Sequence, residues 1–490
     1  MNYDLLALAW QHGLDYRSMA KKARDTLVLA RLADPPVSRE RQSYDLDSLA
    51  RKHGLGGKSE GLSRLKKEYG GYDRIPLDHP EYLAYARQDV ALTQALSALY
   101  PMTPYGRREH TVLAIGGEMS LSGFRVDEDA LAAKLTARDG RRRKLLAELP
   151  ITGSLSTRKG RDELAAAFAL MGVELPRGQA GQPLIGKKSL EAAVSRQPSG
   201  CPSRSLAAAV IEANAQHSVL AQVHMHLVDG RVHARVNAGQ ATGRWSITDP
   251  GMTVLGKHGD RLDERSVFLP EPGDVILTAD LAQIDPRAVA AHCQDPAYLE
   301  LFAPGRDFHA EVAARVFGDP SLRDVAKKLN NSVNYGVGAT KLHETTGLPL
   351  QVCLDYRAGM KEQFPQWAQW GRNVADDARA GHLLDNGFGR QLRVDPDRAP
   401  TAGPGAVGQS CARDILMDGL LRMDAAGLTP MLRCVVHDEV VLSVPRADYQ
   451  EVGQLVLKCL QGEWAPPGAE QAVPITAALG KPGSTWAGAY

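Results

Sequence analysis

The sequence lacks the cysteine spacing that is typical of zinc sites and disulfide-rich folds. Its six cysteines are scattered along 490 residues and form no C-x-x-C pair. We therefore predict neither a zinc site nor a disulfide framework, and we expect reduced thiols. The six residues are Cys201, Cys293, Cys353, Cys411, Cys434 and Cys459.

Long hydrophobic runs and an excess of one charge are also missing. No apolar segment is long enough to cross a bilayer, and no basic segment precedes the first apolar residues. We therefore predict a cytoplasmic protein without a membrane partner. The net charge is +1, so a polyanion would have to be bound by local basic clusters. There is no low-complexity tract and no internal repeat.

The chain is too long for one hydrophobic core, and its character changes along its length. Residues 1–100 are predicted to be α/β. The stretch PMTPYG at 101–106 predicts a linker, because prolines and glycine interrupt a helix. Residues 107–230 are predicted to be mostly helical.

Short strands are predicted from about residue 231, among them VILTAD at 275–280. A long helical stretch follows from about 307 to 382, and strands return in MLRCVVHDEVVLSVP at 431–445. We therefore expect a sheet whose strands are separated in the sequence by a helical insertion.

Two aspartates stand where predicted strands end. Asp280 ends VILTAD, and Asp438 lies at the tip of the hairpin predicted for 431–445. Either residue alone is more often a turn former or a solvated charge. Together, two such carboxylates can hold two divalent cations roughly 3.5–4 Å apart for phosphoryl transfer. Oxygen ligands of this kind, completed by substrate phosphates, are those that Mg²⁺ prefers.

Polar side chains recur every four residues in RDVAKKLNNSVNYGVG at 323–338. Arg323, Lys327, Asn331 and Tyr335 would therefore share one face of a helix. Two cations one turn apart suit a triphosphate, because arginine offers a bidentate fork and lysine a point charge. Most basic stripes are solvated surface, but a tyrosine followed by Gly336 is unusual for such a face.

Three of these blocks, in this order, resemble motifs of the A-family, polymerase I-like DNA polymerases. DLAQIDPR at 280–287 is similar to the palm motif D-Y-S-Q-I-E-L-R. RDVAKKLNNSVNYG is similar to the fingers motif R-x-x-x-K-x-x-x-[FY]-x-x-x-Y-G, and VVHDEVVL to the hairpin that carries H-D-E. GQATGRWSITDPGM, RDFH and QSCARDIL resemble lesser motifs, and GSLSTRKGRDEL and GEMSLSGFRVDEDAL resemble the thumb and palm-entry segments. The similarity therefore covers nearly the whole chain.

The resemblance implies a multidomain protein of α/β and α+β classes. A right-hand polymerase, with an antiparallel palm sheet and helical fingers and thumb, would follow a partial ribonuclease H-like 3′–5′ exonuclease domain. The implied boundaries are 1–100 for the exonuclease-like domain, 107–230 for palm entry and thumb, 231–300 for palm, 301–400 for fingers, and 401–490 for palm with the hairpin.

The same resemblance implies template-directed addition of dNTPs to a primer 3′-hydroxyl in DNA replication, with pyrophosphate release. Two Mg²⁺ ions would be bound by Asp280, Asp438 and the carbonyl of Leu281, with Glu439 supporting them, and Lys327 would donate a proton to the leaving group. The implied nucleotide-binding residues are His309, Arg323, Lys327, Asn331, Tyr335, Gln283 and Asp285. The implied DNA contacts are Arg244, Gln409 and His437. We expect primer-template DNA and dNTPs as partners and a monomer; no processivity partner can be identified.

Three positions depart from the family pattern. Asp285 replaces a glutamate that blocks a ribose 2′-hydroxyl, so we hypothesise weaker sugar discrimination. Asn331 replaces an aromatic side chain and cannot stack on the incoming nucleotide. Pro286 replaces a leucine.

The first hundred residues resemble only the later part of the exonuclease domain. Asp4 is similar to the acid of its second motif, and Tyr85 and Asp89 to its third motif. The first motif, D-x-E, would lie upstream of Asp4. We therefore predict negligible proofreading, from either a relic domain or a reading frame that starts earlier. No 5′-nuclease domain is present, which favours a phage-type enzyme.

Three other functions share some of these features. A single-subunit RNA polymerase has similar acids and cations, but H-D-E at the hairpin disfavours it. An inactive DNA-binding or scaffold protein needs phosphate contacts and no metal pair. A nuclease acting through residues 1–100 is disfavoured by the missing motif.

Overall fold

The computed structural model describes residues 4–37, 42–58, 61–178, 180–215, 219–256 and 263–490. Within these ranges no helix is long and apolar enough to cross a membrane. The chain forms two compact units. One contains residues 1–123, 234–248 and 270–490, and the other contains 124–233 and 249–269.

An antiparallel four-stranded sheet, in the order β10-β11-β7-β14, is the centre of the first unit. All of its strands are apolar, and β7 and β11 are buried along most of their length, which is typical of strands covered on both faces. α22 packs against β7 and β14. The elements are β7 (Asp274–Leu281), β10 (Leu432–Val436), β11 (Glu439–Pro445), β14 (Ala477–Leu479) and α22 (Tyr449–Leu460).

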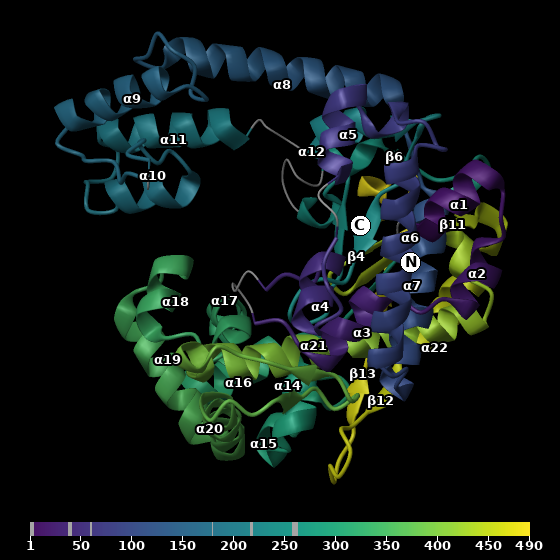
Figure 1. Ribbon diagram of the computed structural model, residues 1–490. Coiled ribbons are helices and arrows are strands. Elements are labelled where there is room, and N and C mark those ends of the chain that lie inside the picture. The colour runs from purple at the N-terminus through teal and green to yellow at the C-terminus, as the bar shows by residue number, and fades with distance from the viewer. Residues whose placement is uncertain (1–3, 38–41, 59–60, 179, 216–218, 257–262) are drawn as a thin grey trace. The chain divides into compact units, whose positions relative to one another are not determined.

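A helical insertion separates β7 from β10 in the sequence, as predicted. Figure 1 shows most of its helices grouped together, in teal and green. Their core is rich in aromatic rings; the Tyr298 ring, for example, meets the Phe364 ring edge to face at 5.0 Å. The main helices are α14 (Ile284–Cys293), α16 (Phe308–Phe317), α17 (Arg323–Asn334), α18 (Ala339–Thr346), α19 (Leu350–Gln363), α20 (Pro365–Arg379) and α21 (Ala399–Ala425).

The described part of residues 1–100 is helical, so the prediction of an α/β domain is wrong there. Its only β contact is an isolated bridge between Val37 and Arg393. The apolar stretch TLVLARLA, which suits a strand or a helix, becomes helical because the Asp25 side chain caps it by accepting from the N–H groups of Leu27 and Val28. The helices are α1 (Asp4–His12), α2 (Tyr16–Lys22), α3 (Thr26–Ala33), α4 (Leu46–Lys52), α5 (Gly61–Tyr69) and α6 (Pro80–Leu99).

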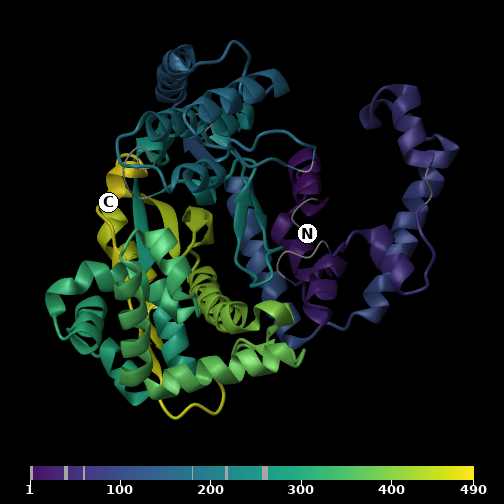
Figure 2. The same cartoon turned by 90° about the vertical axis from the view of Figure 1, so that its left-hand side faces the viewer.

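These N-terminal helices belong to the same compact unit as the central sheet. The linker predicted at 101–106 is only partly correct, because α6 ends at Leu99 and α7 (Pro104–Ser122) begins within it. Pro104 occupies the first helical position, where its missing N–H costs no hydrogen bond. α7 contacts α21, α2, α3 and β4 (Arg235–Asn237), and therefore joins the first hundred residues to the rest of the unit. Figure 2 gives a second view of this arrangement.

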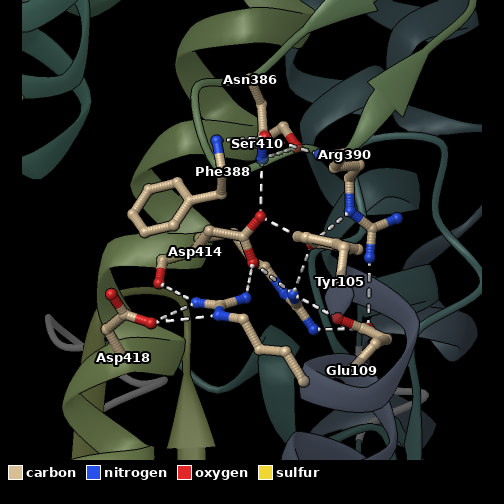
Figure 3. A network of polar contacts seen from close by, with 10 residues as sticks. Tyr105, Glu109, Asn386, Phe388, Arg390, Ser410, Asp414 and Asp418 are labelled. Carbon is tan, nitrogen blue, oxygen red and sulfur yellow. Dashed lines mark hydrogen bonds and ion pairs between the residues drawn. The ribbon is translucent and has the colours of Figure 1, made fainter. Parts of the chain in front are cut away.

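A buried polar network fixes α7 to α21 (Figure 3). Arg413 of α21 donates two hydrogen bonds of 2.7 Å to the Glu109 carboxylate of α7. The neighbouring Asp414 carboxylate accepts from Tyr105 at 2.7 Å and from Asn386 at 2.6 Å. Buried charges are stable only when they are paired, so each member of this network depends on the others.

The second unit consists of helices and a small antiparallel sheet, and its helical content agrees with the prediction for 107–230. The sheet has the order β2-β3-β1-β6. Its elements are β1 (Phe124–Val126), α8 (Glu128–Glu148), α9 (Arg158–Leu170), α10 (Lys187–Val194), α11 (Pro202–Ala215), α12 (Val219–Met225), β2 (Leu227–Val228), β3 (Arg231–Val232) and β6 (Phe268–Leu269). The predicted segment 107–230 is thus divided, since α7 belongs to the first unit.

Candidate active site

Asp280 and Asp438, which are 158 positions apart in the sequence, lie on adjacent strands at one end of the central sheet. Strand β11 pairs with β7 so that Glu439 is opposite Asp280. The N–H of Leu281 donates to the carbonyl of Asp438 at 3.0 Å. Adjacent strands are about 4.8 Å apart, so the backbones of the two aspartates lie within about 5 Å. The structure therefore brings together the two predicted acids.

The hairpin tip is a tight turn. Val436 pairs with Glu439, which leaves only His437 and Asp438 between β10 and β11. His437 has a φ of 58°, a left-handed conformation that two-residue hairpins require at their first central position. Glu439 is fully buried, and its carboxylate accepts a hydrogen bond from the Tyr490 hydroxyl. The turn thus presents His437 and Asp438 while Glu439 is held in the interior.

The chain leaves β7 through a turn in which Gln283 has a φ of 51°. Arg287 fixes this turn, because its buried guanidinium donates to the carbonyls of Ala282 at 2.9 Å and Pro474 at 2.5 Å. Burial lowers the pKa of Arg287 to about 10. The two hydrogen bonds of Arg287 hold the start of α14 in place, and the first turn of α14 carries Asp285.

Asp285 is engaged by Arg244. The guanidinium of Arg244 donates to the Asp285 carboxylate at 2.5 Å, and both side chains are largely shielded from solvent. Tyr335 lies close to the same carboxylate, and burial and then the charge of Asp285 raise the pKa of its phenol well above its ordinary value. Three predicted site residues from distant segments therefore form one cluster.

Glycines surround Tyr335. Gly336 has a φ of 70°, and a Cβ there would lie 2.5 Å from the carbonyl oxygen of Pro400. A Cβ at Gly408 of α21 would lie 3.1 Å from the ring of Tyr335. Close packing against α21 therefore explains why a glycine follows Tyr335 at the end of α17. Gln409, another predicted site residue, directly follows Gly408 in α21.

Cationic side chains line the exposed face of α17. Arg323 donates to the Asp307 carboxylate at 2.9 Å, and this pair is about half exposed. Lys327 is exposed, one turn further along. The Asn331 side chain lies outside the described residues. Arg323 and Lys327 are therefore on the same accessible face, as predicted.

His309 faces this helix from α16. Its Nδ1 is 2.9 Å from the Asn330 amide nitrogen, and the Asn330 oxygen accepts from the Tyr356 hydroxyl. Burial lowers the pKa of His309; the charge of Asp307 opposes this shift, and the charges of Arg323 and Lys327 add to it. The lowered pKa favours the neutral imidazole beside the two cations, where its ring N–H can donate a hydrogen bond to a phosphate oxygen.

The donors at the sheet end fit a hard divalent cation. Among the residues that the structure describes, no three His, Cys, Asp or Glu side chains are grouped to hold a metal ion. The candidate donors are the carboxylates of Asp280 and Asp438 and the backbone carbonyl of Leu281, the residue that follows Asp280. A partial oxygen shell of this kind suits Mg²⁺, which usually keeps waters and binds substrate phosphates.

The residues that resemble exonuclease motifs form a different arrangement. Asp4 and Asp89 line one open cavity of about 1060 Å³. The Asp89 carboxylate, however, is bound by the Lys58 ammonium at 2.8 Å, and Lys58 also donates to the Tyr85 hydroxyl at 3.0 Å. The Asp89 carboxylate is therefore paired with the Lys58 ammonium, which a divalent cation would have to displace.

Several partners of the site were not predicted from the sequence. They are Asp307, Asn330, Lys58 and Tyr490. The sequence could have indicated Asp307, because it lies two residues before His309 in the RDFH motif at 306–309. The other three are separated by at least 21 positions from the residues they bind, and no local pattern marks them.

Comparisons with known proteins agree with this geometry. The family model described as DNA polymerase family A matches residues 207–488. A DNA polymerase of Mycobacterium phage D29 is 28% identical over 472 residues, which are 91% of this chain and 77% of that protein. The thermostable DNA polymerase I of Thermus aquaticus is 28% identical over 259 residues, 49% of this chain and 31% of that enzyme.

A solved structure has a similar fold. It is the POL domain of Pol1 from M. smegmatis, in complex with DNA primer-template and dNTP. The TM-score is 0.71 and the identity 22%, and the match covers 95% of this chain and 82% of that one. The fold is therefore shared over nearly the whole length.

Proposed function

Because the chain belongs to DNA polymerase family A, we propose that Asp280 and Asp438 bind the two Mg²⁺ ions with which it extends a primer. The protein is a DNA-directed DNA polymerase, a nucleotidyltransferase of the phage type that carries out template-directed DNA synthesis. The observation that carries the site proposal is the pairing of β7 with β11, which makes the two aspartates neighbours. An RNA polymerase-like enzyme and an inactive DNA-binding protein are not supported.

Family A polymerases generally use divalent metal ions, and the oxygen donors at the sheet end suit Mg²⁺. Bound ions would stabilise the charge that develops on the attacking and leaving oxygens. Asp280 and Asp438 would hold them from adjacent strands, and the carbonyl of Leu281 would add a ligand. Glu439, buried and bonded to Tyr490, would keep the hairpin in place without contacting the reacting atoms.

The incoming triphosphate would lie along α17. Arg323 is already oriented by Asp307 and would bind phosphate oxygens as a bidentate donor. Lys327 would bind one turn further along and donate a proton to the leaving pyrophosphate, and neutral His309 would donate a hydrogen bond. Because these donors are in place before the triphosphate binds, they need little reorganisation during the reaction.

The DNA and the base pair would be held by residues from three segments. We propose that Tyr335 and Gln283 lie beside the nascent pair, and that Arg244, Gln409 and His437 contact the primer-template duplex. Arg244 donates to Asp285 in this structure. To contact the duplex as well, Arg244 would have to use some of its N–H groups for Asp285 and others for the DNA. Primer-template DNA and dNTPs are then the substrates; we also propose a monomer that acts in the cytoplasm of a host cell.

Primer extension tests the proposed function directly. The purified chain, supplied with a 5′-labelled primer on a DNA template, Mg²⁺ and dNTPs, should extend the primer to the template end. Replacing dNTPs by rNTPs should give much less extension. Failure to extend with any nucleotide would contradict the proposal.

Sugar discrimination should increase when Asp285 is lengthened. The Asp285→Glu variant should raise the ratio of kcat/KM for dCTP over CTP by about tenfold or more, since one methylene in a pocket changes selectivity by about 10–200-fold. Single-nucleotide incorporation measures this ratio. Asp377→Glu, an exposed change on α20, should leave the ratio unchanged. Equal ratios for the wild type and Asp285→Glu would contradict the hypothesis.

Proofreading should be negligible, because Lys58 neutralises Asp89. Incubation of a labelled primer-template with the protein and Mg²⁺, without dNTPs, should show no more 3′ trimming for the wild type than for Asp89→Ala. The polymerase site could also shorten the primer by running in reverse. The Asp438→Asn variant, in which that site should be inactive, serves as the control for this. Trimming that persists in Asp438→Asn and disappears in Asp89→Ala would show an active exonuclease.

A further inference from the structure

The first unit contains a cavity of about 790 Å³ that four separate segments line together. One side is formed by five residues that we call the N-terminal wall: Arg31, Pro36, Val37, Gln42 and Tyr44. The other sides are formed by residues 239–242, by residues 335–341 after α17, and by residues 392–409, which lead into α21 and include its first turns. Ligand sites usually measure about 300–1,000 Å³, so this cavity is large enough for part of a nucleic-acid strand.

The N-terminal wall is attached to the rest of the unit by specific contacts. Asp34 forms an ion pair of 3.0 Å with Arg393, and Val37 makes a parallel bridge with the same residue. The Tyr44 hydroxyl donates to the carbonyl of Asp34 at 2.6 Å. The wall is therefore a fixed part of the cavity.

Positive charge dominates the lining. The described lining residues include four cations, Arg31, Lys341, Arg393 and Arg398, and one acid, Asp395. Arg31 lies over the ring of Tyr44 at 5.3 Å. It forms no ion pair with any residue in the described ranges, and its Nε is buried without a hydrogen-bond partner. A half-buried guanidinium of this kind is prepared to bind an anion, and phosphate matches its geometry.

The cavity is continuous with the proposed insertion site, because Tyr335 and Gln409 also line it. A strand that pairs with the incoming nucleotide beside Tyr335 would therefore continue towards the wall. Grooves that bind single strands combine cations along the backbone with aromatic side chains. Arg31 supplies such a cation from a part of the chain whose exonuclease-like acids are not arranged for catalysis. The buried Tyr44 ring lies beneath the Arg31 guanidinium and supports its position.

We propose that the N-terminal wall binds the single-stranded template ahead of the insertion site, with Arg31 on a backbone phosphate. This proposal rests on the proposed function, which supplies the template and the insertion site. It assigns to the first hundred residues a role in template binding in place of proofreading.

Binding of two DNA substrates tests the role of Arg31. One is a primer-template with a 5′ template overhang of several nucleotides, and the other is the same duplex with a blunt end. Arg31→Gln should weaken binding of the overhang substrate about five- to tenfold at low salt, and reduce the slope of log affinity against log salt by about one. Binding of the blunt duplex should not change. Arg74→Gln, an exposed change in the same hundred residues, should affect neither substrate.

Three controls make the result interpretable. Arg31→Lys should restore part of the lost affinity, and its thermal unfolding should match the wild type. Cross-linking of the unmodified protein to a template with 4-thiothymidine at the first or second unpaired position should label peptides within residues 31–44. The cross-linking measurement does not depend on any variant folding correctly.

The alternatives give different results. Equal losses on both substrates, or cross-links only outside the wall, would overturn the proposal. An unchanged overhang affinity with a raised KM for dNTPs would mean that the cavity binds free nucleotide, which also overturns it. Failure of the proposed function would appear separately, as a wild-type chain that does not extend primers.

Discussion

Replacing Asp438 by asparagine is expected to reduce the rate of nucleotide incorporation about 10³-fold or more, while leaving DNA binding nearly unchanged. Asparagine has the same shape but no charge, so it would bind a divalent cation far more weakly. Metal ions contribute several kcal/mol of transition-state stabilisation, and each 1.36 kcal/mol corresponds to a factor of ten. Single-turnover incorporation with saturating dNTP and primer-template measures this rate.

Asp280→Asn should have an effect of similar size, and the double variant should be little worse than either single variant. The two carboxylates act as a unit, and effects within a unit are not additive. Asp274→Asn is the matched control, because Asp274 lies at the other end of β7, opposite Pro445. It should retain incorporation. A fast Asp438→Asn enzyme, or an equally slow Asp274→Asn enzyme, would contradict the assignment of the metal site.

Replacing Arg413 by methionine is expected to destabilise the first unit by about 3–5 kcal/mol, because it leaves the buried Glu109 carboxylate without its main partner. Both side chains are 2% exposed, and two hydrogen bonds of 2.7 Å join them. Thermal unfolding should begin about 5 °C or more below the wild type. Circular dichroism at neutral pH measures this shift.

Two comparisons separate this effect from a simple loss of side-chain volume. Arg379→Met removes an exposed pair with Asp376 and should cost less than about 1 kcal/mol. The double variant Glu109→Gln, Arg413→Met should recover part of the lost stability, since it removes the unpaired charge as well. An Arg413→Met protein as stable as the wild type would show that the network contributes little.

The same network should respond to acid. Burial alone would raise the pKa of Asp414, but Arg413, Arg108 and Arg390 surround its carboxylate and hold the pKa well below its ordinary value. A group with a lowered folded pKa stabilises the protein above its unfolded pKa of about 3.9, and this contribution is lost as the pH falls below that value. The difference between Arg413→Met and the wild type should therefore be largest near neutral pH and become smaller in strong acid.

Local sequence patterns specify the strands, the turn and the helix that carry the site. The β-branched residues of 275–281 and 432–445 specify strands by local preference, and the turn of His437 and Asp438 follows from the spacing between them. The four-residue spacing of Arg323 and Lys327 likewise fixes their common helical face before any packing occurs. Ordered motifs along the chain were sufficient to indicate the family.

Which of these residues meet, and which form the first hundred residues take, is visible only in the folded chain. TLVLARLA contains good helix formers, and the cap at Asp25 and packing against α7 stabilise the helix there. The pairs Lys58–Asp89, Arg244–Asp285 and Glu109–Arg413 join residues 31 to 304 positions apart. Such contacts depend on burial and on the register between distant segments, and no local pattern in a single sequence encodes either.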